Sequence, residues 1–300
     1  MKLQPIMKLS WQGLSTIVFR RKKPLIASII ITDKCNLSCR HCAVGNITGL
    51  IYPHSQIQAE MKQMYSQGIR ILLLYGGEPF LWEDNCVTLR DLVIEAKQMG
   101  FLLVSVVTNG TLGLDLPEAD LILVSIDGSR DRHNEIRGDT YDKIIENIKT
   151  SSNDKICLYM AVNQINKGDI EEVCKVAEST RNVLAVSFNF HTPYPGTEDL
   201  KLSRDEKRGC CSRIEKMMEF GYPVMNLRSA FPYIADNTFP TPCRQCVIME
   251  NNQQWTCGRC IDIKGLCDEC GYFFAAEFSL LFGGNIKVIW DLLRTYGRFL

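Results

Sequence analysis

Six short, continuous apolar runs, rich in branched residues, constrain the fold of this chain more than any other feature of its sequence. Their ranges are 25–32, 69–75, 101–107, 121–126, 156–162 and 183–190. Runs of this length and composition are typical of strands buried in a parallel sheet. Amphipathic helical patterns separate most of them, as at 55–68 and 86–100. The sequence therefore predicts an α/β fold, a partial (β/α)6 barrel of mostly parallel strands.

The composition of the chain changes twice along its length. Residues 1–24 form a basic segment with interspersed apolar side chains, and 25–204 carry the barrel pattern. Residues 205–300 contain a helical pattern, proline-containing loops, a cysteine-rich stretch and a terminal amphipathic segment. We expect a core partial barrel at 25–204, preceded by a basic amphipathic segment and followed by a small cysteine-rich C-terminal unit with a terminal helix.

Charge and cysteine usage limit the classes of function. The chain has 34 basic and 34 acidic residues, so its net charge gives no reason to expect a nucleic-acid partner. Its first residues lack the order of a signal peptide, and no stretch of about 18 residues stays apolar and uncharged. We expect a cytoplasmic protein. In a reducing compartment its 14 cysteines are better suited to binding metal than to forming disulfides.

Three cysteines lie directly after the first predicted strand. Cys35, Cys39 and Cys42 have the spacing C-x3-C-x2-C. A closed structural zinc site needs four protein ligands. His41 could be the fourth, but adjacent residues of one short loop rarely both turn inward. Three thiolates instead suit three corners of a 4Fe–4S cluster, whose fourth iron then stays open to another ligand.

This cysteine motif, with His41 before its last cysteine, resembles the signature of the radical S-adenosylmethionine (radical SAM) superfamily. Gly76, Gly77, Glu78 and Pro79 follow the second strand and resemble the family segment that binds the ammonium group of S-adenosylmethionine. The resemblance implies that S-adenosylmethionine binds the open iron. It also implies that an electron, delivered by a flavodoxin- or ferredoxin-type donor, cleaves the sulfonium to a 5′-deoxyadenosyl radical that abstracts hydrogen from the substrate.

Polar side chains also follow the later strands. They are Thr108, Asn109, Ser125, Asp127, Asn163 and His191. The first four resemble family segments that lie near the methionine and ribose parts of S-adenosylmethionine, whereas the last two are candidates from their position alone. Asn-Gly and Asp-Gly are also common turn pairs, and a lone histidine is often structural, so a purely structural role is the alternative for each.

The C-terminal unit contains three C-x2-C pairs. Their members are Cys243, Cys246, Cys257, Cys260, Cys267 and Cys270. Two such pairs could form a zinc ribbon. In a radical SAM protein, a cysteine-rich C-terminal unit instead resembles the SPASM and twitch extensions, which carry auxiliary iron–sulfur clusters, although the spacing departs from the usual SPASM pattern. We expect one auxiliary 4Fe–4S cluster.

The resemblance leaves the substrate open, because superfamily membership fixes only how the radical is generated. Residues 1–24 are basic, and the last segment has one apolar face, formed by Ile286, Ile289, Trp290, Leu293 and Tyr296. Such segments suit an anionic membrane surface, although both could simply pack on the barrel. The first hypothesis is therefore a peripheral enzyme acting on a membrane lipid or other amphiphile. The alternatives are a SPASM-type peptide maturase and a non-enzymatic, zinc-stabilised binding protein.

Overall fold

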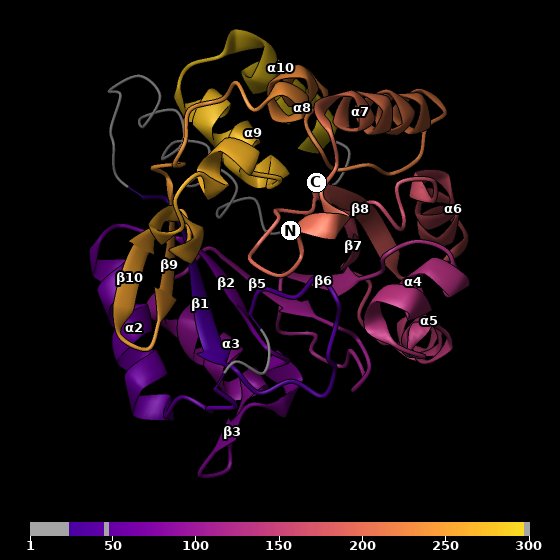
Figure 1. The fold of residues 1–300 in the computed structure, drawn as a ribbon. Coiled ribbons are helices and arrows are strands. Elements are labelled where there is room, and N and C mark those ends of the chain that lie inside the picture. Colours follow the sequence, from indigo (N-terminus) through magenta and orange to yellow (C-terminus); the bar gives the residue numbers. More distant parts are fainter. Residues whose placement is uncertain (1–23, 45–47, 297–300) are drawn as a thin grey trace.

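The structure, a computed structural model, describes residues 24–44 and 48–296 (Figure 1). All six predicted strands are present and lie side by side in parallel in one sheet. Their bounds are β1 Ile26–Thr32, β2 Ile71–Gly76, β5 Leu103–Thr108, β6 Leu121–Ser125, β7 Ile156–Val162 and β8 Val183–Phe190. The predicted fold class, a partial barrel of mostly parallel strands with a cysteine-rich C-terminus, is confirmed.

Two further strands, which the sequence analysis did not predict, come from the cysteine-rich stretch. β9 (Cys246–Glu250) pairs in parallel with β1, and β10 (Gln253–Thr256) pairs antiparallel with β9. The eight-stranded sheet thus has the order β10-β9-β1-β2-β5-β6-β7-β8. A separate small hairpin joins β3 (Glu83–Asp84) to β4 (Val87–Thr88). The cysteine-rich segment therefore lies beside the strand that leads into the first cysteine loop, and a unit boundary near residue 205 stays a prediction.

Helices connect and cover the strands. Their bounds are α2 His54–Ser66, α3 Leu89–Met99, α4 Arg130–Arg137, α5 Tyr141–Thr150, α6 Ile170–Ser179, α7 Arg204–Glu219, α8 Phe231–Asp236, α9 Phe273–Phe282 and α10 Ile286–Tyr296. Short 3-10 turns lie at Pro79–Leu81, Glu198–Leu200, Arg228–Ala230, Arg259–Asp262 and Leu266–Glu269. Figure 1 shows α7, α8, α9 and α10 gathered on one side of the molecule, near β8.

Local sequence explains where the crossover helices begin and which face they bury. In α3, Thr88 and Asp91 form a capping box, in which the backbone N–H of Thr88 donates to Asp91 Oδ2 at 2.8 Å. The buried side chains of α3 recur at helical spacing: Leu89, Leu92, Val93 and Ala96. The helix therefore packs one apolar stripe on the sheet and leaves the opposite face to solvent.

The two C-terminal helices differ in their surroundings. On α9, the ring of Phe273 lies 4.9 Å from that of Phe190 on β8, measured between centroids, so α9 packs on the end of the sheet. On α10, Ile289 and Tyr296 pack against the core, so the apolar face predicted for this segment is divided between core and solvent. No single helix of the described residues has both the length and the hydropathy of a membrane span. The pair α9 and α10 passes that test together, with a bend of 118°.

Candidate active site

The loop after β1 brings the three cysteines of the first motif to the carboxyl edge of the parallel sheet, where α/β folds usually bind ligands. Cys35 and Cys39 are half-buried and Cys42 is exposed. The backbone N–H of Cys42 donates to the carbonyl of Cys39 at 3.1 Å, which folds the second half of the motif into a turn. The sequence spacing therefore produces one compact loop with three thiols.

Gly76 and Gly77 allow the end of β2 to approach this loop closely. The N–H of Gly77 donates to the carbonyl of Thr32 at 2.7 Å, and the N–H of Glu78 donates to the carbonyl of Lys34 at 2.9 Å. A Cβ atom on Gly76 would collide with the Thr32 carbonyl, and one on Gly77 with the Lys34 carbonyl. The glycine pair thus fixes the backbone that leads directly into Cys35.

Glu78 is fully buried at the centre of the site. Its Oε1 accepts hydrogen bonds from Thr108 Oγ1 at 2.7 Å and from the N–H of Phe80 at 3.1 Å, and its Oε2 accepts from the N–H of Asn109 at 2.8 Å. Burial raises the pKa of Glu78, while these hydrogen bonds lower it. Because a carboxylate oxygen can accept two hydrogen bonds, Oε2 can still accept one from a bound ammonium group.

Asn109, which follows the end of β5, contacts the cysteine loop. Its Nδ2 donates to Asn36 Oδ1 at 2.9 Å and lies 3.8 Å from the sulfur of Cys35. The N–H of Leu37 lies 3.4 Å from the same sulfur. Two N–H donors therefore approach the sulfur of Cys35, which is the environment that iron–sulfur proteins use to stabilise and tune a ligating thiolate.

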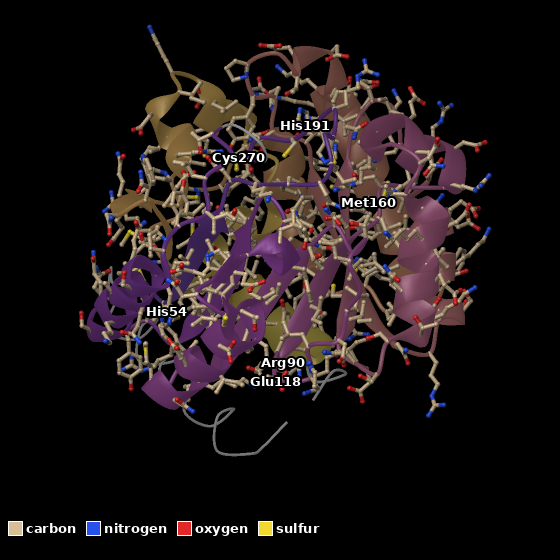
Figure 2. The ribbon with its side chains drawn as sticks, turned by 90° about the horizontal axis from the view of Figure 1, so that it is seen from below. His54, Arg90, Glu118, Met160, His191 and Cys270 are labelled. Atoms are coloured by element: carbon tan, nitrogen blue, oxygen red, sulfur yellow. The ribbon has the colours of Figure 1, made fainter. Side chains whose placement is uncertain are left out.

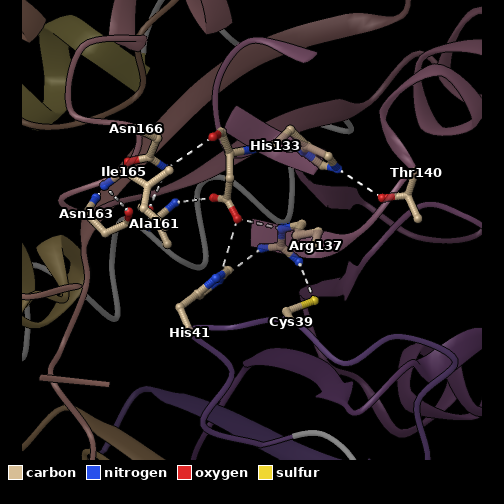
Figure 3. A network of polar contacts seen from close by, with 10 residues as sticks. Cys39, His41, His133, Arg137, Thr140, Ala161, Asn163, Ile165 and Asn166 are labelled. Atoms are coloured by element: carbon tan, nitrogen blue, oxygen red, sulfur yellow. Dashed lines mark hydrogen bonds and ion pairs between the residues drawn. The ribbon is translucent and has the colours of Figure 1, made fainter. Parts of the chain in front are cut away.

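A buried polar network around Asp127, which follows the end of β6, reaches the other half of the cysteine loop. Figure 3 labels Arg137, His41 and Cys39 of this network. Arg137 Nε donates to Asp127 Oδ2 at 2.5 Å, and its Nη1 lies 3.8 Å from the sulfur of Cys39. The same guanidinium lies 3.3 Å from His41 Nε2. Arg137 joins Asp127 to two members of the predicted motif, Cys39 and His41, and was not predicted from the sequence.

The charges of this network follow from burial and from the ion pair. Burial would raise the pKa of Asp127, but Arg137, His41 and His133 together hold it below its usual range. Burial lowers the pKa of His41 to about 4, so its ring is neutral near pH 7. Burial raises the pKa of the Cys39 thiol, while Arg137 opposes that rise. The cation beside Cys39 therefore favours a thiolate.

The remaining candidates lie at the later strand ends, and their roles as ligands stay predictions. His191 is buried, and its ring meets that of His41 edge to face at 6.2 Å between centroids. Its Nε2 lies 2.9 Å from Thr197 Oγ1. The Oδ1 of Asn163 accepts from the N–H of Ile165 at 2.9 Å, so this side chain closes its own turn. Ser125 is the buried last residue of β6.

The donor set of this site fits a 4Fe–4S cluster held by Cys35, Cys39 and Cys42. The three thiols share one loop, and N–H groups approach two of them. Among residues 24–44 and 48–296, no three His, Cys, Asp or Glu side chains converge on one point as ligands of a single ion would. In a cluster, each cysteine binds a different iron.

The C-terminal cysteines lie around a second site. Five of them line one pocket together with Thr192 from the end of β8: Cys243, Cys257, Cys260, Cys267 and Cys270. The sixth, Cys246, has its sulfur 3.6 Å from that of Cys243, and this hydrogen bond lowers the pKa of Cys243 to about 7. The three C-x2-C pairs, which are separate in the sequence, thus converge in the fold.

Two contacts fix this second site to the barrel. The N–H of Gly271, next to Cys270, donates to Thr192 Oγ1, next to His191, at 3.0 Å. Figure 2 labels Cys270 and His191. Arg259, which lies between Cys257 and Cys260 in the sequence, pairs with Glu250 Oε1 at 3.0 Å. It also donates to the carbonyl of Ala43, next to Cys42. Arg259 was not predicted from the sequence, although it lies inside a C-x2-C pair.

A parallel partial barrel with a three-thiol loop and a buried carboxylate at its mouth defines a class of protein that can hold an iron–sulfur cluster beside a small cationic ligand. The Radical SAM superfamily model matches residues 29–194, more than half of the chain, and the chain belongs to this superfamily. It is therefore an enzyme, and the alternative of a non-enzymatic zinc-stabilised protein is wrong.

Individual relatives match part of the chain. The chain is 32% identical over 165 residues to a probable GTP 3′,8-cyclase of Saccharolobus islandicus, covering 52% of each chain. It is 28% identical over 179 residues to the sporulation killing factor maturation protein SkfB of Bacillus subtilis, covering 55% of this chain and 42% of SkfB. The chain thus spans about half the length of the curated relatives it matches.

The fold similarity extends further than the sequence similarity. SuiB of Streptococcus suis, solved with S-adenosylmethionine, superposes with a TM-score of 0.65 over 95% of this chain and 71% of SuiB, at 15% identity. At this identity the likeness concerns the fold alone. It includes the C-terminal unit, because the unmatched 5% is too small to contain residues 205–300.

When bound, the cluster and S-adenosylmethionine supply a 5′-deoxyadenosyl radical, and the residues of this chain determine how the cofactor is held. Cys35, Cys39 and Cys42 would bind three irons. Glu78 Oε2 would accept a hydrogen bond from the amino group of S-adenosylmethionine. Asn109 and Arg137 direct N–H groups at the sulfurs of Cys35 and Cys39, where they would offset the negative charge of the ligating thiolates.

Proposed function

We propose that this protein is a peptide-modifying radical SAM enzyme, which abstracts hydrogen from an unactivated C–H bond of a peptide side chain or backbone. The observation that carries this proposal is the fold likeness to SuiB, which extends through the C-terminal unit. The structure of SuiB has also been solved with the precursor peptide SuiA. The sequence similarity to SkfB, named a maturation protein, supports the same substrate class. A reduced flavodoxin or ferredoxin supplies the electron.

Direct contacts connect the C-terminal cysteine site with the barrel and with the first cysteine loop. The C-terminal unit contacts both outer strands of the six-stranded barrel sheet, β1 through β9 and β8 through the carbonyl of Gly271, which accepts from the N–H of Phe190. Arg259 links the second site to the loop that bears Cys42. Six cysteines exceed the four that one 4Fe–4S cluster requires, and we propose that this pocket holds one auxiliary cluster.

The substrate class is tested by mass spectrometry of peptide extracts from anaerobic cells that produce either the wild-type protein or the C35A/C39A/C42A variant. We expect a peptide whose mass changes only in the presence of the intact cysteine loop. Cys86→Ala, at an exposed thiol outside both sites, is the matched control and should keep the change. Lipid and nucleotide extracts of the same cells are analysed in parallel, and a change that depends on the three cysteines but is confined to those extracts would contradict a peptide substrate.

A lipid or other amphiphile is the second candidate, because α10 presents an apolar surface to solvent. Ile286, Trp290 and Leu293 are 80%, 68% and 63% exposed and recur at helical spacing, so they point to the same side of the helix. Such a surface suits the interface of a bilayer. Flotation with anionic phosphatidylglycerol vesicles tests it by comparing the wild type with the I286S/W290S/L293S variant.

Binding of the wild type that the triple substitution abolishes would support this candidate. Phe220→Ser is the matched control, because Phe220 is 74% exposed but lies at the end of α7 rather than on this surface. Absence of flotation for the wild type, or equal flotation of all three proteins, would remove the lipid candidate.

A further inference from the structure

Lys207 is a buried cation in a position where the helix pattern calls for an apolar residue. The buried side chains of α7 are Lys207, Cys210, Cys211, Ile214 and Met217, which is the spacing of a core-facing stripe. Only 2% of Lys207 is exposed. Burying an ammonium group is costly unless a negative charge compensates it, so the surroundings of Lys207 need to supply one.

In the described part of the chain, no carboxylate lies within ion-pair distance of Lys207, and the attraction of the nearby Glu269 acts over a longer distance. Its Nζ donates to Asn237 Oδ1 at 2.9 Å and lies 5.9 Å from the centre of the Phe190 ring. No ion pair joins it to an acidic residue of the described ranges, and the nearby Glu269 pairs with Lys201 at 2.8 Å instead. A neutral amide and an aromatic ring do not balance a buried charge.

The contacts of Lys207 lead to the C-terminal cysteines. Asn237, which accepts from Lys207, donates through Nδ2 to the carbonyl of Cys270 at 2.9 Å. Cys270 lines the pocket that we propose for the auxiliary cluster. A 4Fe–4S cluster with four thiolate ligands carries a net negative charge in both of its usual states, and reduction adds one more.

We infer that Lys207 is the buried counter-charge of the auxiliary cluster and raises its reduction potential. A fixed cation favours the more negative, reduced state of a neighbouring cluster, and the low local dielectric strengthens that effect. The inference rests on the auxiliary cluster of the proposed function and is independent of the substrate. Lys207 is a positioning and tuning residue, because it acts on the cluster without ligating it.

The test uses the full-length C35A/C39A/C42A protein, in which the auxiliary cluster is the only cluster that can assemble. Its midpoint potential is measured by redox titration followed by electron paramagnetic resonance. Lys207→Gln, which keeps a donor for Asn237, should shift the midpoint to a more negative potential, and Lys207→Arg should leave it unchanged. Lys201→Gln is the matched control, because it removes an exposed positive charge near the same loop, where solvent screens it, and should shift the midpoint much less.

An unshifted midpoint in Lys207→Gln, or an equal shift in Lys201→Gln, would overturn the inference. If the Lys207→Gln protein loses the cluster altogether, the Lys207→Arg protein decides. A parental midpoint in Lys207→Arg supports the inference, whereas loss of the cluster from Lys207→Arg as well overturns it. A parental protein without any auxiliary signal also overturns it. The mass change expected of a peptide substrate is measured separately, so the two proposals can fail independently.

Discussion

Arg137 Nε lies 2.5 Å from Asp127 Oδ2, and this ion pair is buried, with the Asp127 side chain fully shielded from solvent. Removing one partner of such a pair leaves an uncompensated charge in the interior. We therefore expect Asp127→Asn to lower the free energy of unfolding by roughly 3–5 kcal/mol. Urea denaturation under anaerobic conditions measures this loss.

The exposed pair of Arg130 and Asp142 provides the control for that measurement. Its N–O distance is also 2.5 Å, but both side chains are more than half exposed. Solvent and salt screen such a pair, so Asp142→Asn should change stability little. Equal effects of the two substitutions would contradict the structural role assigned to Asp127 and Arg137.

Gly77→Ala tests the close approach between the end of β2 and the cysteine loop. The new methyl group would collide with the backbone carbonyls of Lys34 and Asp33, which cannot rotate away as a side chain would. We expect a loss of about 1–3 kcal/mol in stability and a lower content of bound iron, because Cys35 follows Lys34 directly. Unfolding and iron analysis measure the two effects.

Gly209→Ala is the matched control for that glycine. Gly209 lies in the interior of α7, and a Cβ there meets no atom within 4 Å. Alanine should therefore stabilise the helix by up to about 1 kcal/mol and leave the iron content unchanged. A Gly77→Ala protein that retains full iron and stability would show that the glycine pair does not hold the loop.

Glu277 on α9 predicts a pH dependence of stability. It is buried, where it accepts from the N–H of Leu227 at 2.8 Å, and burial raises its pKa to about 7 from the usual 4.5. Between these two values the folded state keeps a proton that the unfolded state loses, so stability falls as the pH rises through this window. Above pH 7 the loss is complete and amounts to roughly 3 kcal/mol.

Glu277→Gln should remove this slope, because glutamine keeps the acceptor for Leu227 and cannot ionise. The comparison is the difference in unfolding free energy between pH 5 and pH 8, measured for the wild type and the variant, so that contributions common to both proteins cancel. A wild type that is no more pH-dependent than the variant would contradict the burial of an ionisable Glu277.

Much of the barrel could be predicted from the sequence, because each of its strands is a continuous apolar run and the helices between them carry clear end signals. β9 was missed for physical reasons. It is short, begins at Cys246 and ends at the buried Glu250, and its partner β1 lies at the opposite end of the chain. Local sequence patterns do not indicate which distant segment a strand pairs with.

The residues of the candidate site could also be predicted only in part from the sequence. The cysteine loop, Gly77 and Glu78 follow strands in the sequence, and the structure brings them together at one edge of the sheet. Arg137 and Lys207 lie on helices with several charged residues, where a cation normally points to solvent. Their burial depends on the packing of whole helices, and only the fold reveals it.

The central claim is that the loop of Cys35, Cys39 and Cys42 holds the cluster that cleaves S-adenosylmethionine. The most direct test measures 5′-deoxyadenosine formed from S-adenosylmethionine by the anaerobically reconstituted, dithionite-reduced protein, for the wild type and for Cys39→Ala. We predict formation by the wild type and its complete loss in the variant, with Cys86→Ala unaffected. Formation at the wild-type rate by Cys39→Ala would contradict the claim.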